Sequence, residues 1–478
     1  MKYETVIGLE VHVELATKSK IFCSCSAEFG AEQNDSVCPA CCGMPGMLPV
    51  TNKKVVELGM MAGMLTNCHI NRYTTFDKKS YYYPDLPCSY QITQWFSPIC
   101  VNGGVEIETA AGKKVIGIKQ IHMEEDAGKL VHDDWTDTSL VDFNRTSVPL
   151  CEIVSKPDIR SAEEAIAYLK RLRTLLSFAR VSKCRMEEGS MRCDVNLSIR
   201  PAGSDELGVR TEMKNMNSLS AIARAIEFET ARHIDALERG TETLVQETRR
   251  WDDVKGRSFA MRNKETAADY RYFPDPNLTP IVIDDEWFDS VKASLPELPE
   301  IKADRYVKEL GLTEDDSKAL TSSRTLCDIF EDALDVTGKP KETANWVLTE
   351  CTGFAKKDNI SVDDLKIDAN KLGKLINMTQ KGEVNRNMAK RVLSAVYKED
   401  ADPREYCEKN GLFAQNDEGA ILEIVKKAIA ENEKSVADYK SGKVKAKQAI
   451  FGRIMKELKG NGDPQVIQKL LDAELEKI

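Results

Sequence analysis

The chain has 478 residues, 42% of them hydrophobic and 30% charged, so it can bury a substantial core and form roughly two to four domains. A formal net charge of −10 excludes a globally basic nucleic-acid-binding protein, so any polyanion must find a local basic patch. Neither a long apolar run nor a signal-peptide pattern occurs, and we expect no membrane span. We therefore expect a cytoplasmic protein whose 14 cysteines are mostly reduced.

Strict alternation near the N-terminus predicts a half-buried β-strand. In residues 7–15, IGLEVHVEL, apolar side chains alternate with Gly8, Glu10, His12 and Glu14. One face of this strand would carry two carboxylates and an imidazole. Such a face suggests a chemical role, although most polar strand faces simply contact water.

Paired cysteines follow the strand. Cys23 and Cys25 form a C-x-C pair, and Cys38 and Cys41 form a C-x-x-C pair roughly a dozen residues later. Two such pairs can close a tetrahedral four-cysteine zinc site, which would hold a loop in place and leave no open position for catalysis. The alternative is that these cysteines are reduced and bind no metal, and Cys42 is not needed in either case.

Three later segments alternate in the same way and are further strand candidates. They are KVIGIKQIHME at 114–124, RCDVNLSIR at 192–200 and VRTEMKN at 209–215. Their polar positions include Glu124 with the following Glu125, Asp194, Glu212 and Lys214. If these strands share a sheet with residues 7–15, their polar faces converge.

Converging carboxylates predict a cation site. They repel and raise one another's pKa, and a divalent ion relieves that repulsion. Magnesium prefers oxygen ligands and is commonly shared with nucleotide phosphates. His12 is an unusual magnesium ligand, so it would hold a coordinated water, orient a carboxylate or favour manganese. The chain has no P-loop, G-x-G-x-x-G or G-x-S-x-G motif, so any nucleotide chemistry would use a metal held by the strands.

The order of the predicted elements indicates an α+β protein with three parts. We expect a mainly antiparallel β-rich cradle over residues 1–293, with helices beginning at Ser161 and Ser218. The segment LPELPE at 295–300 is a plausible linker, after which nearly every segment has helical periodicity. We place an all-helical domain at 294–402 and a small helical tail at 403–478.

A basic segment at 440–464 lies in the predicted tail. Ile450, Ile454 and Leu458 give it a buried helical stripe. Candidate contacts to a phosphate backbone are Lys443, Lys445, Lys447 and Arg453. The alternative is an ordinary solvated face.

Ten stretches of the sequence together resemble one family. They are IGLEVHVEL, KSYYYPDLP, YQITQ, MEEDAGKL, VDFNR, EIVSKPDIRSAEEAIAYLKRLR, MEEGSMRCDVNLSIRP, RTEMKNMNS, VQETRRWD and DYRYFPDPNL. They are similar to the GatB family, one of the components of the bacterial and organellar aspartyl/glutamyl-tRNA amidotransferase. The resemblance covers essentially the whole chain and is densest over residues 3–283.

The resemblance implies a subunit of a glutamine-dependent ligase that forms a C–N bond within a heterotrimer. ATP would activate the carboxylate of Glu-tRNA(Gln) or Asp-tRNA(Asn), and ammonia from a partner amidase subunit would displace the phosphate. The other implied partners are a small third subunit and the misacylated tRNA, which the tail would contact.

On this reading Mg²⁺ and the ATP phosphates would be held by residues from several strands. The predicted catalytic metal ligands are Glu10, His12, Glu125, Asp194 and Glu212. Glu124 and Lys214 are second choices, Glu124 as a ligand and Lys214 as a catalytic phosphate contact. The competing hypotheses are a tRNA-binding scaffold subunit without chemistry of its own and a free-standing metal-dependent ligase.

The sequence departs from the family at several positions. Thr146-Ser147 stands where Ala-Gly is usual, and Cys88-Ser89 stands where Lys-Gly is usual. Cys42 and Cys151 replace aliphatic residues. These changes leave the proposed ligands intact.

Overall fold

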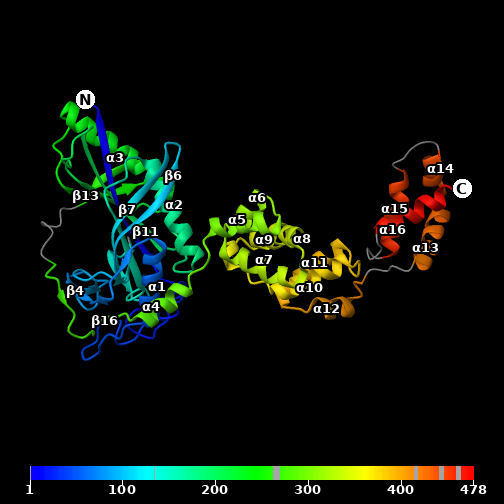
Figure 1. Cartoon of the computed structure of the whole chain (residues 1–478), viewed down its shortest axis with the longest axis horizontal. Coiled ribbons are helices and arrows are strands. Elements are labelled where there is room, and N and C mark those ends of the chain that lie inside the picture. The colour runs from blue at the N-terminus through cyan, green and yellow to red at the C-terminus, as the bar shows by residue number, and fades with distance from the viewer. Residues whose placement is uncertain are drawn as a thin grey trace. The chain divides into compact units, whose positions relative to one another are not determined.

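A computed structural model describes residues 2–133, 135–261, 270–413, 418–440, 446–458 and 464–477. The chain divides into two compact units, residues 1–296 and 297–478 (Figure 1). The first is built on an antiparallel-rich sheet and the second is helical, which confirms the predicted α+β class. None of the described helices is long and apolar enough to cross a lipid bilayer.

A nine-stranded sheet organises the first unit, in the order β14-β13-β12-β11-β1-β10-β7-β6-β2. Its strands are β1 Tyr3–Glu14, β2 His69–Ile70, β6 Cys100–Thr109, β7 Gly112–Glu125, β10 Pro149–Ser155, β11 Met191–Pro201, β12 Thr211–Lys214, β13 Glu247–Asp252 and β14 Arg257–Ala260. All neighbours in the sheet are antiparallel except β12 and β13, which are parallel. The predicted N-terminal strand thus lies between β10 and β11, with partners on both sides.

Three smaller sheets accompany the main one. They are β15-β4-β5, formed by Phe273–Pro274, Asp77–Ser80 and Tyr90–Thr93; β16-β3, formed by Ile281–Val282 and Tyr73–Thr74; and the hairpin β8-β9, formed by Lys129–Asp133 and Thr138–Asp142. Strand β5 packs against β7 of the main sheet. The segment before β5 and the segment around β15 are therefore held close to the end of β7.

The apolar face of the main sheet is covered by helices. These are α1 Lys53–Leu65, α2 Ala162–Phe178 and α3 Leu219–Arg239, and α4 Asp285–Ala293 packs on α1. Leu9, Val11 and Val13 of β1 are fully or almost fully buried in this core. The Ser161 hydroxyl accepts a hydrogen bond from the Glu164 amide, so the predicted N-terminal cap is confirmed.

Helices make up the described part of the second unit. They are α5 Pro299–Leu310, α6 Glu314–Leu320, α7 Arg324–Thr337, α8 Pro340–Trp346, a π turn at Val347–Cys351, α9 Thr352–Asp358, a 3₁₀ turn at Val362–Asp364, α10 Ala369–Gln380, α11 Arg386–Glu399, α12 Pro403–Asn410, α13 Glu418–Glu431, α14 Glu433–Lys440, α15 Ala446–Glu457 and α16 Pro464–Leu475. One hydrophobic core runs from Tyr306 to Leu412 and another from Ile421 to Leu475. The division at residue 403 stays a prediction, and a boundary after α12 would keep the first core intact because Cys407 belongs to it.

Candidate functional site

Hydrogen-bond register brings polar residues of four strands into one row. His12 of β1 pairs with Glu152 of β10 on one side and with Arg192 of β11 on the other. Glu152 in turn pairs with His122 of β7. Directly paired residues of neighbouring antiparallel strands point to the same face of a sheet, so the row lies on the face opposite the helix-covered core.

A second row lies two residues along the same strands. Glu10 pairs with Asp194, and Glu212 of β12 pairs with Asn196, two residues further along β11. The rows are separated by roughly 7 Å, because a strand rises about 3.4 Å per residue. The polar face therefore carries two neighbouring clusters of possible ligands.

The first cluster consists of His12, Glu124 and Glu152. One ligand atom from each lies within 4.8 Å of the others. His12 Nε2 is 3.5 Å from Glu124 Oε1 and 3.4 Å from Glu152 Oε2. His122 Nε2 lies 3.0 Å from Glu152 Oε2, so it shares this carboxylate with His12.

The carboxylates of the first cluster favour protonated imidazoles. Burial by itself would lower the pKa of His122, but Glu152 and Glu124 outweigh it and raise this pKa to about 10. The pKa of His12 is raised as well, since its hydrogen bond and charge interaction with Glu152 exceed the effect of burial. Burial would raise the pKa of Glu152, yet the two imidazoles hold it well below its usual value. Positive charge is therefore stabilised at this place on the sheet.

The second cluster consists of Glu10, Asp194 and Glu212, whose ligand atoms also lie within 4.8 Å of one another. Lys214 Nζ is 2.5 Å from Asp194 Oδ2 and 3.0 Å from Glu212 Oε1. Burial, then the charges of Glu152 and Glu212, raise the pKa of Glu10. Burial would lower the pKa of Lys214, but Asp194 and Glu212 outweigh it and raise this pKa.

Neighbouring side chains orient the carboxylates of the second cluster. Asn196 Nδ2 donates to Glu10 Oε1 at 2.9 Å. Thr248 Oγ1, from the parallel strand β13, donates to Glu212 Oε2 at 2.7 Å. Such contacts restrict ligand rotation and are typical of built cation sites.

Glu125 lies apart from both clusters. It pairs with Pro149 while Glu124 pairs with Leu150, so the two adjacent glutamates point to opposite sides of β7. Glu125 Oε1 accepts a hydrogen bond from the Ile92 amide at 2.9 Å, and Oε2 accepts one from Ser147 Oγ at 2.6 Å. Burial raises the pKa of Glu125 to about 7 despite these donors. It borders a pocket of about 290 Å³ that also touches the cysteine loop.

The structure thus divides the predicted ligand set. It brings Glu10, Asp194 and Glu212 together, joins His12 to Glu124 in the adjacent row, and leaves Glu125 elsewhere.

Sequence reasoning missed Glu152, His122 and Thr248. A signal for Glu152 was present in PLCEIVS at 149–155, where this glutamate is the charged residue of an otherwise apolar strand.

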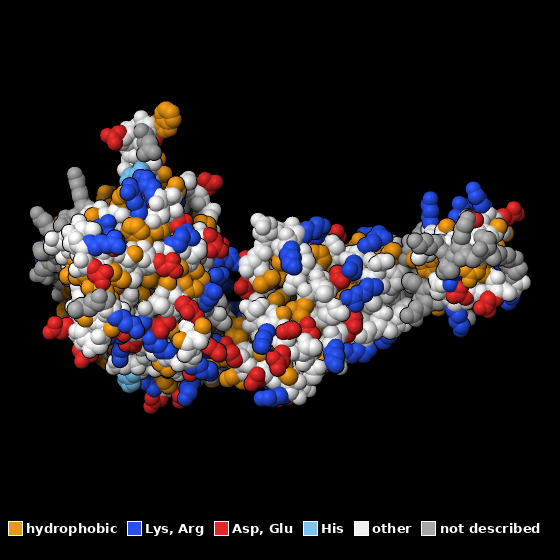
Figure 2. Space-filling model, turned by 90° about the horizontal axis from the view of Figure 1, so that it is seen from above, with side chains coloured by type: hydrophobic (Ala, Val, Ile, Leu, Met, Phe, Trp, Pro, Cys, Tyr) orange, Lys and Arg blue, Asp and Glu red, His pale blue; other side chains and the backbone are white. Residues whose placement is uncertain are grey.

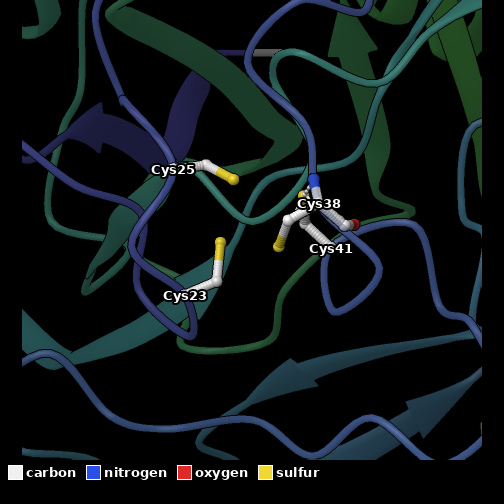
Figure 3. Close-up of side chains that lie close together, drawn as sticks. All are labelled: Cys23, Cys25, Cys38 and Cys41. Atoms are coloured by element: carbon white, nitrogen blue, oxygen red, sulfur yellow. Dashed lines mark hydrogen bonds between the residues drawn. The ribbon is translucent and has the colours of Figure 1, made fainter.

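The four predicted cysteines converge (Figure 3). Cys23 and Cys25 approach from one segment of the loop, and Cys38 and Cys41 from another, with all four sulfur positions within 4.8 Å. The sulfurs of Cys38 and Cys41 are 3.8 Å apart. A tetrahedron with zinc–sulfur bonds of about 2.3 Å has an edge of about 3.8 Å, so this donor set fits zinc.

A buried lysine lies beside the cysteine cluster. Lys20 is 0% exposed, and its Nζ is 3.6 Å from Cys41 Sγ and 3.3 Å from the Phe143 carbonyl. The hydrogen bond from Cys23 is the largest cause lowering the pKa of Cys41 to about 4, and the charge of Lys20 adds to it. A buried ammonium offsets the negative charge that four thiolates around one Zn²⁺ would carry.

The basic tail helix keeps its predicted apolar stripe. Ile450, Ile454 and Leu458 are between 0% and 3% exposed. Arg453 pairs with Glu431 at 2.9 Å, and Lys447 pairs with Asp472. Lys443 and Lys445 lie outside the described residues. On the visible face of the first unit, Lys and Arg are interspersed with Asp and Glu (Figure 2), so that face is not a broad basic field.

Comparison with known proteins covers nearly the whole chain. A model described as the GatB/GatE catalytic domain matches residues 5–289, and one described as the GatB domain matches residues 328–475. Proteins named as the GatB-type component of an aspartyl/glutamyl-tRNA(Asn/Gln) amidotransferase are 52% identical in Caldicellulosiruptor bescii and 48% identical in Thermoanaerobacter pseudethanolicus, each over 100% of both chains. The protein of this name in Agathobacter rectalis is 53% identical over 98% of both chains. The chain therefore belongs to the GatB/GatE family.

Proposed function

We propose that this chain is the subunit that activates the carboxylate of Glu-tRNA(Gln) or Asp-tRNA(Asn) with ATP, so that ammonia can convert it to the amide. The observation that carries this proposal is the pair of neighbouring ligand clusters on one sheet face, His12–Glu124–Glu152 and Glu10–Asp194–Glu212. The names of the relatives support a role as one subunit of an amidotransferase.

Activation is needed because a carboxylate is a poor electrophile. Ammonia cannot readily attack a stable anion, whereas phosphorylation gives a mixed anhydride with a good leaving group. Phosphoryl transfer depends mainly on positioning and on neutralising charge. Mg²⁺ bound to the two clusters would supply charge neutralisation and hold phosphate oxygens.

The side chains of the sheet would orient the reactants. The carboxylates of Glu10, Asp194 and Glu212 supply oxygen donors, which suit Mg²⁺ or Mn²⁺. His12 supplies a nitrogen in the other cluster, and this favours Mn²⁺ or a water-mediated contact there. Asn196 and Thr248 would keep two of the carboxylates from rotating away.

The proposal assigns the remaining parts of the reaction to partners. Ammonia would come from glutamine hydrolysis in an amidase subunit, within a complex that also contains a small third subunit. The helical tail would contact tRNA through its basic helix, including Lys447 and Arg453. Zn²⁺ bound by Cys23, Cys25, Cys38 and Cys41 would hold the loop that follows β1.

The test uses the complex of this chain with its amidase and third subunit. Both misacylated tRNAs are assayed with ATP, Mg²⁺ and glutamine, measuring amide formation and tRNA-dependent ATP cleavage. We expect Glu10→Gln and Glu152→Gln to lower both rates at least 100-fold while tRNA affinity and glutamine hydrolysis remain. If both variants cleave ATP at the wild-type rate, the chain is a tRNA-binding scaffold and the proposal is wrong.

A further inference from the structure

Lys214 lies between two carboxylates of the second cluster. Its Nζ contacts Asp194 Oδ2 at 2.5 Å and Glu212 Oε1 at 3.0 Å. Lys214 follows Glu212 by two residues on the same strand, so both side chains point to one face of the sheet. The ammonium therefore takes up a position where these carboxylates would otherwise attract a metal cation.

The geometry leaves little room for a second cation beside this ammonium. Thr248 holds Glu212 Oε2 and Asn196 holds Glu10 Oε1, so these groups are already oriented. A divalent ion that binds all three carboxylates must lie within a few ångströms of Nζ, where the two positive charges repel strongly. Lys214 and a divalent ion thus compete for the same negative charge.

The first cluster is different in this respect. Within the described residues, Glu124 and Glu152 form their ion pairs with His12 and His122. Imidazole nitrogens are themselves metal ligands, whereas an ammonium is not. The same divalent ion should therefore meet a competitor in one cluster and a potential ligand in the other.

We propose that Lys214 is a built-in competitor that keeps a divalent ion out of the Glu10–Asp194–Glu212 cluster until a nucleotide phosphate draws the ammonium away. This inference rests on the proposed metal-binding function of the two clusters. A triphosphate attracts both Lys214 and a divalent ion, so it converts competition for carboxylates into binding of both cations to one ligand. Occupation of the second cluster is then coupled to nucleotide binding.

Mn²⁺ binding to the full-length chain tests the competition directly. The free ion is measured by electron paramagnetic resonance during a titration without nucleotide. We expect wild type to bind one Mn²⁺ tightly, lost in Glu152→Gln, and a second weakly, lost in Glu10→Gln. Lys214→Met should tighten the second site at least tenfold and leave the first within twofold, whereas Lys214→Arg should keep the second site weak.

Lys113 provides a matched control. It pairs with Glu106 at 3.0 Å on the surface of the β6–β7 hairpin. Lys113→Met removes the same charge and should change neither Mn²⁺ site.

A second measurement uses the wild-type chain and does not depend on folding of a variant. Acylation of Lys214 by a water-soluble reagent is followed by mass spectrometry, with Lys113 as the internal reference. Saturating Mn²⁺ with a non-hydrolysable ATP analogue should speed acylation of Lys214 or shield it by direct phosphate contact. An acylation rate that is unchanged within 20% overturns the proposal, because the ammonium has then not moved.

The two proposals fail in different ways. If Lys214→Met binds a second ion no more tightly than wild type while the first site is intact, the competition is refuted and the metal-binding proposal stands. If neither wild type nor any variant binds Mn²⁺ at either cluster, both proposals fail.

Discussion

Two serines in left-handed backbone conformations should respond oppositely to replacement by glycine. Ser89 has φ +57° and Ser147 has φ +62°, a region that costs a residue with a Cβ roughly 1–2 kcal/mol. Glycine removes this cost but gains unfolded-state entropy worth roughly 0.5–1 kcal/mol. Ser89 is exposed, so Ser89→Gly should stabilise the first unit by about 0.5–1 kcal/mol.

Ser147 differs because its hydroxyl donates to buried Glu125 at 2.6 Å. Loss of a hydrogen bond to such a group costs roughly 1.5–3 kcal/mol, which exceeds the strain that glycine relieves. Ser147→Gly should therefore destabilise by about 1–2 kcal/mol, and Ser147→Ala by about 0.5–1 kcal/mol more, because alanine keeps the strain.

Calorimetry of the full-length chain would measure these differences. A change of 1 kcal/mol shifts the melting temperature of a unit of this size by about 2–4 °C, so the signs are resolvable. Stabilisation by Ser147→Gly would refute the reasoning, since it would show that the Glu125 contact contributes less than the backbone strain. The wild-type backbone conformation at Ser89 would be questioned by a loss of stability in Ser89→Gly.

Two further predictions concern metal content and pH. Zinc measured by mass spectrometry should fall from one to below about 0.1 per chain in Cys38→Ser and stay at one in Cys42→Ser, because a closed site needs all four thiolates; equal loss in both would contradict the assignment. Burial, and then Arg232, lower the pKa of His233 to about 4, below the 6.5 of an unperturbed histidine. This folded-state value is depressed, so its contribution to stability is complete above pH 6.5 and is lost as pH falls toward 4. Urea unfolding should show wild type losing about 2 kcal/mol more than His233→Gln between pH 7 and pH 5, and equal losses would rule out this histidine as the cause.

The predictable part of the site follows from local periodicity. Alternation in residues 7–15 is enough to place Glu10 and His12 on one face, because side chains of a strand alternate whatever its neighbours are. The spacing of Cys23, Cys25, Cys38 and Cys41 likewise predicts a set of four ligands.

The rest depends on pairing between distant strands. Glu152 meets His12 only because β10 pairs with β1 in one particular register, and alternation within either strand says nothing about that register. Lys20 lies between Ser19 and Ile21 in a segment without helical or strand periodicity, so its burial beside Cys41 had no sequence signal. The family resemblance of residues 146–147 and 88–89 to Ala-Gly and Lys-Gly has a backbone reason, because Ser147 and Ser89 both occupy conformations that favour glycine.

Glu124 and Glu125 give the sharpest test of how register determines function. They are adjacent and chemically identical, but their backbone partners are Leu150 and Pro149, so they lie on opposite sides of β7. Glu124 faces His12 and Glu152, whereas Glu125 is held by Ile92 and Ser147.

Glutamine at each of these positions should therefore have different effects on Mn²⁺ affinity. Glu124→Gln should weaken the tighter site at least tenfold, because it removes a charged ligand. Glu125→Gln should leave that affinity within about twofold, since a neutral amide of the same shape replaces a group that lies off the cluster. If Glu125→Gln weakens binding as much as Glu124→Gln does, the first cluster has been assigned to the wrong face of the strand, and the single five-residue pocket predicted from sequence is the better account.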